Sequence, residues 1–175
     1  MIRKSVLAVC AGFLQSACSH GGDFVTYAVW NRSSDHEIED ARMFAANDGA
    51  KTSTTLFVAS FLIALPVGAE GWSFGGVTNL PDSGHRMPDR IAVTWRLPPK
   101  PGQEMQKGDQ VGPYYFDLTK EIPADVRQMI RSGKNYHLHI GVAGGIEPAT
   151  LRWRLVEWRR EDTVGSKELR RGGDW

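Results

Sequence analysis

The stretch RIAVTWRL at residues 90–97 decides the fold class, because bulky apolar residues alternate in it with smaller or charged ones. Every second side chain from Ile91 to Leu97 would lie on one face of an extended chain, and Arg90 and Arg96 would lie on the other. This period of two is typical of a β-strand with one buried face. We therefore predict a strand at residues 90–97.

Other segments carry a similar signal on both sides of this strand. Aromatic and β-branched residues fill them and turn-forming residues separate them. A single short helix is predicted at residues 123–132, because an apolar stripe of helical spacing ends there before a glycine. The expected fold is mainly β, an antiparallel β-sandwich or curved sheet with one short α-helix. The further predicted strands lie at residues 24–30, 37–45, 114–118, 136–143 and 150–158.

Two segments leave more than one interpretation open. Residues 54–67, TTLFVASFLIALPV, are the most apolar part of the chain after the N-terminus. They are too short for a helix across a bilayer, which needs about 20 residues. We expect a buried strand or hairpin, with a surface patch for a partner or membrane as the alternative. Residues 98–112 are rich in proline, glycine and charge and predict a long exposed loop, of the kind that is often functional.

The N-terminus has the pattern of a bacterial export signal. Arg3 and Lys4 precede a short apolar run, and small residues lead to Cys18. We expect residues 1–17 to be a signal peptide, residues 18–160 a single β-rich domain and residues 161–175 a charged C-terminal tail. Lipid on Cys18 would anchor the chain in the outer membrane, facing the periplasm. Because Gln15 stands where lipoprotein signals usually have leucine, an unlipidated periplasmic or secreted product is the alternative.

Charge and composition argue against several classes of ligand. The formal net charge is +1, and no nucleic-acid or phosphate-binding motif occurs, so we expect no nucleic-acid partner. His137 and His139 would share one face of a strand, but no third metal ligand lies near them in the sequence. We therefore expect surface or interface histidines rather than a metal site, and no cofactor.

The motif GWSFG at residues 71–75 matches the G-x-S-x-G pattern of serine hydrolases. That motif needs a helix directly after the serine, whereas Ser73 is followed by GGVTNLP, a poor helix start. We interpret the segment as a glycine-lined bend between strands. The alternative interpretation is a small serine esterase with Ser73 as its nucleophile.

Arginine and aromatic residues supply candidates for binding a protein partner. Arg152 and Arg154 would share the outward face of a strand, which is either a solvated sheet surface or a recognition surface. Trp72 and Trp158 are candidates for exposed tryptophans, which either anchor a partner or cover a sheet edge. The partner-binding residues that we predict are Trp72, Ser73, Phe74, Arg152, Arg154 and Trp158.

Three longer segments together resemble a known group of proteins. They are VTYAVWNRSSDHEIEDARMF at residues 25–44, GGVTNLPDSGHRMPDRIAVTWR at residues 75–96 and YHLHIGVAGG at residues 136–145. With the lipoprotein-like signal, their order and spacing resemble small bacterial lipoproteins of unknown function that are encoded beside type VI secretion lipase effectors. Members of that group are taken to be immunity proteins.

The resemblance implies a periplasmic immunity protein, not an enzyme, that binds and neutralises a type VI secretion phospholipase effector by occluding its active site. Loops at residues 71–76 and 100–112, with the face of Arg152, Arg154 and Trp158, would cover the entrance to that site. An envelope structural or assembly lipoprotein is the alternative function. It would share the signal and the β-rich domain but would bind an envelope component.

Overall fold

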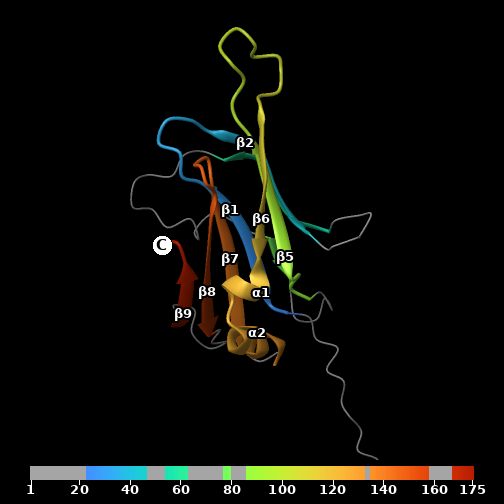
Figure 1. The fold of residues 1–175 in the computed structure, drawn as a ribbon, viewed down its shortest axis with the longest axis vertical. Helices are drawn as coiled ribbons and strands as arrows, with labels where there is room; N and C mark the ends of the chain where they lie inside the picture. Colours follow the sequence, from blue (N-terminus) through green and yellow to red (C-terminus); the bar gives the residue numbers. More distant parts are fainter. Residues whose placement is uncertain (1–22, 47–53, 63–76, 80–85, 133–134, 158–166) are drawn as a thin grey trace, which may run out of the picture.

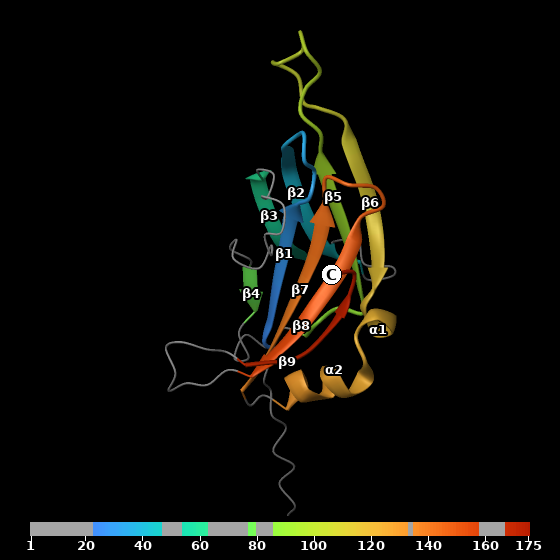
Figure 2. The ribbon, with the colours of Figure 1, turned by 90° about the vertical axis from the view of Figure 1, so that its left-hand side faces the viewer.

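The computed structural model describes residues 23–46, 54–62, 77–79, 86–132, 135–157 and 167–175. These residues form two β-sheets that pack face to face, with two short helices at one end (Figures 1 and 2). The prediction of a mainly β sandwich is confirmed. The predicted helix is confirmed as α2 (Ala124–Arg131), and a shorter helix, α1 (Leu118–Glu121), precedes it.

The first sheet has five strands, and one of its pairings is parallel. β1 and β7 run in the same direction, with Val25 opposite Leu138 and Asn31 opposite Gly144, whereas the other pairs are antiparallel. A hydrophobic period of two is the same in parallel and antiparallel strands, so this parallel pairing could not be predicted from the sequence. In spatial order the strands are β4 (Val77–Asn79), β1 (Val25–Asn31), β7 (Tyr136–Gly144), β8 (Thr150–Glu157) and β9 (Lys167–Gly173).

The second sheet has four strands and is antiparallel throughout. The chain enters it from β1 through a turn at residues 32–37, so two consecutive strands belong to different sheets. β5, the strand predicted from RIAVTWRL, lies inside this sheet between β2 and β6. The spatial order is β3 (Thr55–Leu62), β2 (Ile38–Ala45), β5 (Arg90–Arg96) and β6 (Gln110–Asp117).

The core lies between the two sheets. Trp95 of β5 is almost completely buried, and its ring stacks on Tyr114 of β6 with ring centroids 5.1 Å apart. α2 adds Val126 and Ile130 to the core from the end of the sandwich, as its apolar stripe predicts. Trp153 of β8 is also buried, and its Nε1 donates a hydrogen bond to the carbonyl oxygen of Glu121 at 2.9 Å, which joins α1 to the sheet.

The apolar segment at residues 54–67 contributes one edge strand rather than a fully buried element. Leu56 and Phe57 of β3 are buried, whereas Val58 is half exposed. Residues 63–67 lie outside the described part of the chain. Neither helix that the structure describes is long and apolar enough to cross a membrane.

The C-terminal segment, which we expected to be a charged tail, instead adds β9 to the five-stranded sheet. Most side chains of β9 are exposed, so the segment has no apolar period by which a strand could be predicted. Backbone pairing with β8 and an ion pair of 2.6 Å between Arg170 and Asp125 of α2 hold it in place. A strand at a sheet edge needs only one hydrogen-bonded neighbour, and tertiary structure supplies it here.

Candidate functional site

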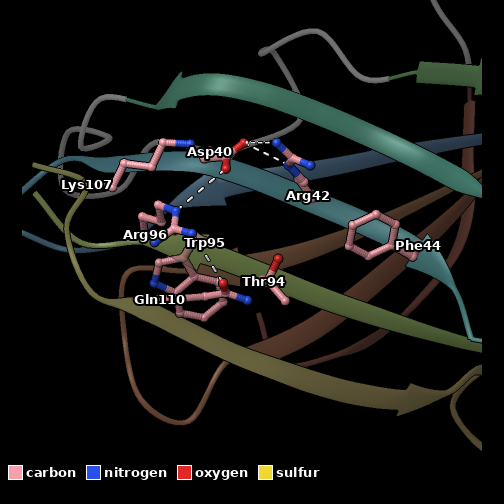
Figure 3. Close-up of a pocket in the computed structure, with 8 residues that line it drawn as sticks. All are labelled: Asp40, Arg42, Phe44, Thr94, Trp95, Arg96, Lys107 and Gln110. Carbon is pink, nitrogen blue, oxygen red and sulfur yellow. Dashed lines mark hydrogen bonds and ion pairs between the residues drawn. The ribbon is translucent and has the colours of Figure 1, made fainter.

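A polar groove lies on the outer face of the four-stranded sheet (Figure 3). Its volume is about 280 Å³. Its side chains come from neighbouring strands and from the loop between β5 and β6, so the antiparallel pairing of the sheet brings them together. The residues that line the groove are Asp40, Arg42, Phe44, Thr94, Trp95, Arg96, Lys107 and Gln110.

The side chains of Asp40 and Arg42 line the groove at a β-bulge in β2. Ile38 and Ala41 are both buried, three positions apart instead of two, and the register of β2 against β5 shifts between Glu39 and Arg42. At the bulge Asp40 has a φ angle of 46°, in the left-handed region that side-chain-bearing residues seldom adopt. Bulges commonly redirect a side chain toward a functional site.

Asp40 lies between two arginines and contacts both. Its Oδ1 accepts a hydrogen bond from Nε of Arg42 at 2.8 Å and lies 2.7 Å from Nη2 of the same residue. Its Oδ2 lies 3.8 Å from Nε of Arg96. Figure 3 shows the carboxylate between the two guanidinium groups. The groove therefore presents two positioned arginines around one carboxylate.

The loop at residues 97–109, which we call the finger, projects beyond the sheets at the end of the sandwich opposite the helices (Figures 1 and 2). Its base is closed by a backbone hydrogen bond from Leu97 to Asp109 at 3.0 Å and by an ion pair between Lys100 and Asp109 at 3.1 Å. Gly108 is required at this base, because a Cβ atom there would lie 1.8 Å from the carbonyl oxygen of Leu97. The predicted exposed loop at residues 98–112 is confirmed for residues 98–109, whereas residues 110–112 begin β6.

The tip of the finger is also ordered by local hydrogen bonds. The amide of Gln103 bonds to the carbonyl oxygen of Lys100 at 2.9 Å, and the amide of Gly102 donates to the carboxylate of Glu104 at 2.8 Å. This hydrogen bond lowers the pKa of Glu104. Next to Glu104, Met105 is 100% exposed. The finger thus presents one large apolar side chain on a polar, internally bonded loop.

The finger and the groove form one continuous surface. Arg96, at the end of β5, donates to the carbonyl oxygen of Gly108 at 3.0 Å and lies 3.4 Å from the side-chain oxygen of Gln110. Lys107 lines the groove from the finger side. Sequence reasoning identified the loop but missed the groove, because Asp40 and Arg42 lie far from Arg96 in the chain and no local motif links them.

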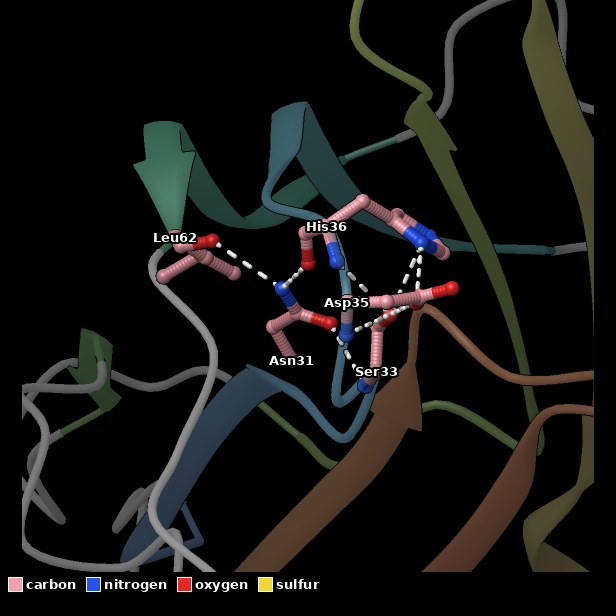
Figure 4. Close-up of polar contacts among 5 residues, drawn as sticks. All are labelled: Asn31, Ser33, Asp35, His36 and Leu62. Carbon is pink, nitrogen blue, oxygen red and sulfur yellow. Dashed lines mark hydrogen bonds and ion pairs between the residues drawn. The ribbon is translucent and has the colours of Figure 1, made fainter.

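The turn between β1 and β2 brings a serine, an aspartate and a histidine together (Figure 4). Ser33 Oγ lies 2.8 Å from Nδ1 of His36, and Oδ1 of Asp35 lies 2.7 Å from the same ring nitrogen. A catalytic relay needs the hydroxyl and the carboxylate on different ring nitrogens. This arrangement therefore does not have the geometry of a serine hydrolase triad.

The same network has a clear role in holding the turn. Asn31 accepts a hydrogen bond from the amide of Ser33 at 2.9 Å and donates to the carbonyl oxygens of His36 at 2.8 Å and Leu62 at 3.3 Å (Figure 4). The hydrogen bond from Ser33 lowers the pKa of Asp35, with a smaller contribution from His36. The network ties β1, β2 and the end of β3 together where the chain passes between the sheets.

The predicted recognition face of β8 contains a stack of aromatic and cationic side chains. Arg152 is only 7% exposed, and its guanidinium lies 4.0 Å from the ring centroid of Trp30 and 4.7 Å from that of Trp175. Arg171 lies 4.8 Å from the same Trp175 ring. Arg152 is thus placed in a packing role between two tryptophans, whereas Arg154 is partly exposed.

His137 and His139 are neighbours on the same outer face, with ring centroids 4.2 Å apart. Thr26 Oγ1 lies 2.7 Å from Nε2 of His137, and the ring of Phe24 stacks on His137 at 3.8 Å. Burial, then repulsion from His139 and Arg154, lowers the pKa of His137 to about 3. No group of three metal-ligating side chains occurs among the residues that the structure describes.

Five of the predicted site residues, Cys18, Trp72, Ser73, Phe74 and Trp158, lie outside the described residues. Their predicted roles remain predictions. Comparisons of the chain with protein-family models, with curated proteins and with solved structures found no match.

Proposed function

We propose that this chain is a periplasmic immunity protein, which binds a type VI secretion phospholipase effector and neutralises it by occluding its active site. The export signal and the resemblance described above motivate the choice of partner. The observation that carries a binding role is the finger, which projects from the sandwich (Figure 1). It contains Met105, whose side chain is fully exposed.

An exposed methionine on an ordered loop is well suited to occlude an apolar cleft. A phospholipase must admit acyl chains, so the entrance to its active site is apolar. Burying a methionine side chain contributes about 1.5–3 kcal/mol, and the flexible thioether adapts to irregular pockets.

The internal bonds of the finger favour binding for a second reason. A loop that is already ordered loses less conformational entropy when it binds than a flexible loop does. The hydrogen bonds of Gly102 and Gln103 and the ion pair between Lys100 and Asp109 provide this order. Occlusion needs no nucleophile or metal on the inhibitor, only a shape that fills the entrance.

The test is co-expression of the full chain with the phospholipase encoded by the adjacent gene, directed to the periplasm. We expect the cells to survive, and the two proteins to purify as a complex that lacks phospholipase activity. Failure to form a complex, with continued killing, would contradict the proposal and would favour the envelope assembly function.

Met105→Ala tests the role of the finger, and Leu169→Ala is its matched control. Leu169 is another partly exposed apolar side chain, on β9 of the other sheet. We expect Met105→Ala to weaken binding by at least about tenfold, in the range of an interface hot spot. Leu169→Ala should leave the affinity unchanged.

A further inference from the structure

We infer that the groove beside the finger receives acidic side chains of the protein partner, so that the partner carries carboxylates beside the apolar cleft that takes Met105. This inference rests on the proposed function and deepens it, because it specifies the chemistry of the partner surface.

The charge of the groove is the first argument. Its lining contains three cationic side chains, Arg42, Arg96 and Lys107, and a single carboxylate, Asp40. Arg42 contacts Asp40 and is about half exposed, and Arg96 lies at the edge of ion-pair distance from Asp40. Lys107 is exposed and has no ion-pair partner among the residues that the structure describes. The groove therefore has an excess of positive charge on a protein whose formal net charge is only +1.

The geometry of the groove is the second argument. Arginine presents several donors in a planar fork that matches a carboxylate. Asp40 accepts hydrogen bonds from only some of the N–H groups of the two arginines. The carbonyl oxygen of Gly108 and the side chain of Gln110 hold Arg96 in position. The remaining donors of Arg42 and the ammonium group of Lys107 border the groove (Figure 3).

The position of the finger favours a protein over a membrane surface as the source of the anionic groups. The finger projects beyond the strands that carry the groove, so a flat surface that approaches this end of the sandwich would meet the tip of the finger first (Figure 1). That tip carries Gln103, Glu104 and Gln106 around Met105, and such polar and acidic residues oppose insertion into an anionic bilayer. A concave protein surface can accept the finger and reach the groove together.

The experiment measures the affinity of the full chain for the same phospholipase, with Arg42→Gln and Lys107→Gln as the variants. Arg131→Gln is the matched control, because Arg131 is an exposed arginine on α2 at the opposite end of the sandwich. We expect each groove variant to weaken binding about threefold and the double variant about tenfold at low salt. The difference from wild type should shrink in about 1 M salt, where charges are screened within about 3 Å.

The outcomes separate this inference from the proposed function. If wild type binds the phospholipase and both groove variants bind as tightly as Arg131→Gln, the inference is overturned and the proposed function stands. If wild type does not bind the phospholipase, the proposed function fails, and a hexaglutamate peptide then probes the groove. If wild type and Arg131→Gln bind the peptide but Arg42→Gln and Lys107→Gln do not, the result would support the carboxylate site. Absence of peptide binding, or binding of anionic vesicles that needs Arg42, would overturn it.

Discussion

The buried His137 and the half-buried His139 are expected to make the stability of this protein depend on pH above the range where carboxylates titrate. His137 is 5% exposed, stacked on Phe24 and close to His139. Burial and neighbouring charges lower the pKa of His137 to about 3, and burial followed by Arg154 lowers that of His139 to about 4. In the unfolded chain both would have the ordinary histidine pKa of about 6.5.

The direction of the effect follows from which state binds protons. Above about pH 6.5 both histidines are neutral in both states and contribute nothing to the pH dependence. As the pH falls below that value, the unfolded chain gains protons that the folded chain does not bind until about pH 3–4. The free energy of unfolding therefore decreases on acidification.

The magnitude comes from the same two values. Each pH unit between the unfolded and folded pKa costs about 1.4 kcal/mol per histidine. At about pH 5 each histidine lowers the free energy of unfolding by about 2 kcal/mol. Because His139 is partly exposed, its contribution is smaller, and the two histidines together lower the free energy of unfolding by about 2–4 kcal/mol. This is a large fraction of the roughly 5–15 kcal/mol that stabilises a typical domain.

Urea unfolding followed by tryptophan fluorescence, at pH values from about 7.5 to about 5, measures this loss through the midpoint at constant m value. His137→Gln should reduce the change with pH by about half, and the double variant with His139→Gln should abolish it over this range. A wild-type midpoint that does not change between about pH 6.5 and about pH 5, or a double variant that loses as much stability as wild type, would refute the reasoning.

Two further predictions concern positions where the backbone allows little choice. At Gly141 an added Cβ atom would lie 2.1 Å from the ring of Trp30. Gly141→Ala should therefore push that ring away from Arg152 and lower the free energy of unfolding by about 1–3 kcal/mol. An unchanged melting temperature in thermal unfolding would contradict this packing. Asp40→Gly and Asp40→Ala both remove the carboxylate that binds Arg42, but only the alanine keeps the strain of a φ angle of 46°. In urea unfolding the glycine variant should be more stable than the alanine variant by about 0.5–1 kcal/mol. Equal unfolding midpoints for the two variants would contradict this and would show that the backbone at the bulge relaxes in the alanine variant.

The sequence predicted strands well wherever one face of a strand is buried in the sandwich. In β5, β7 and β8 every second residue is apolar and lies in the core, as a period of two predicts, although most of the intervening residues of β7 are buried as well. The stripe of α2 is visible for the same reason, with helical spacing. β9 was missed because its exposed side chains carry no such period, and its place depends on pairing with β8.

The candidate site was predictable only in part. The composition of residues 98–112 indicated an exposed loop, but nothing in the sequence showed that it forms an ordered finger closed by Lys100 and Asp109. The bulge at Asp40 interrupts the period of two in β2. In a sequence such an interruption cannot be distinguished from the end of a strand, so the bulge could not be predicted. Arg152 was predicted to face outward, and only the structure shows that Trp30 and Trp175 enclose it.

The sequence by itself determined the longer elements that have a buried apolar face, because local periodicity and turn residues record which of their side chains are buried. It also predicted the exposed loop between β5 and β6. Tertiary structure alone decided the parallel pairing of β1 with β7, the addition of β9 and the assembly of the groove. Strand order and the meeting of Arg42 with Arg96 depend on contacts between residues far apart in the chain, and these contacts leave no local pattern.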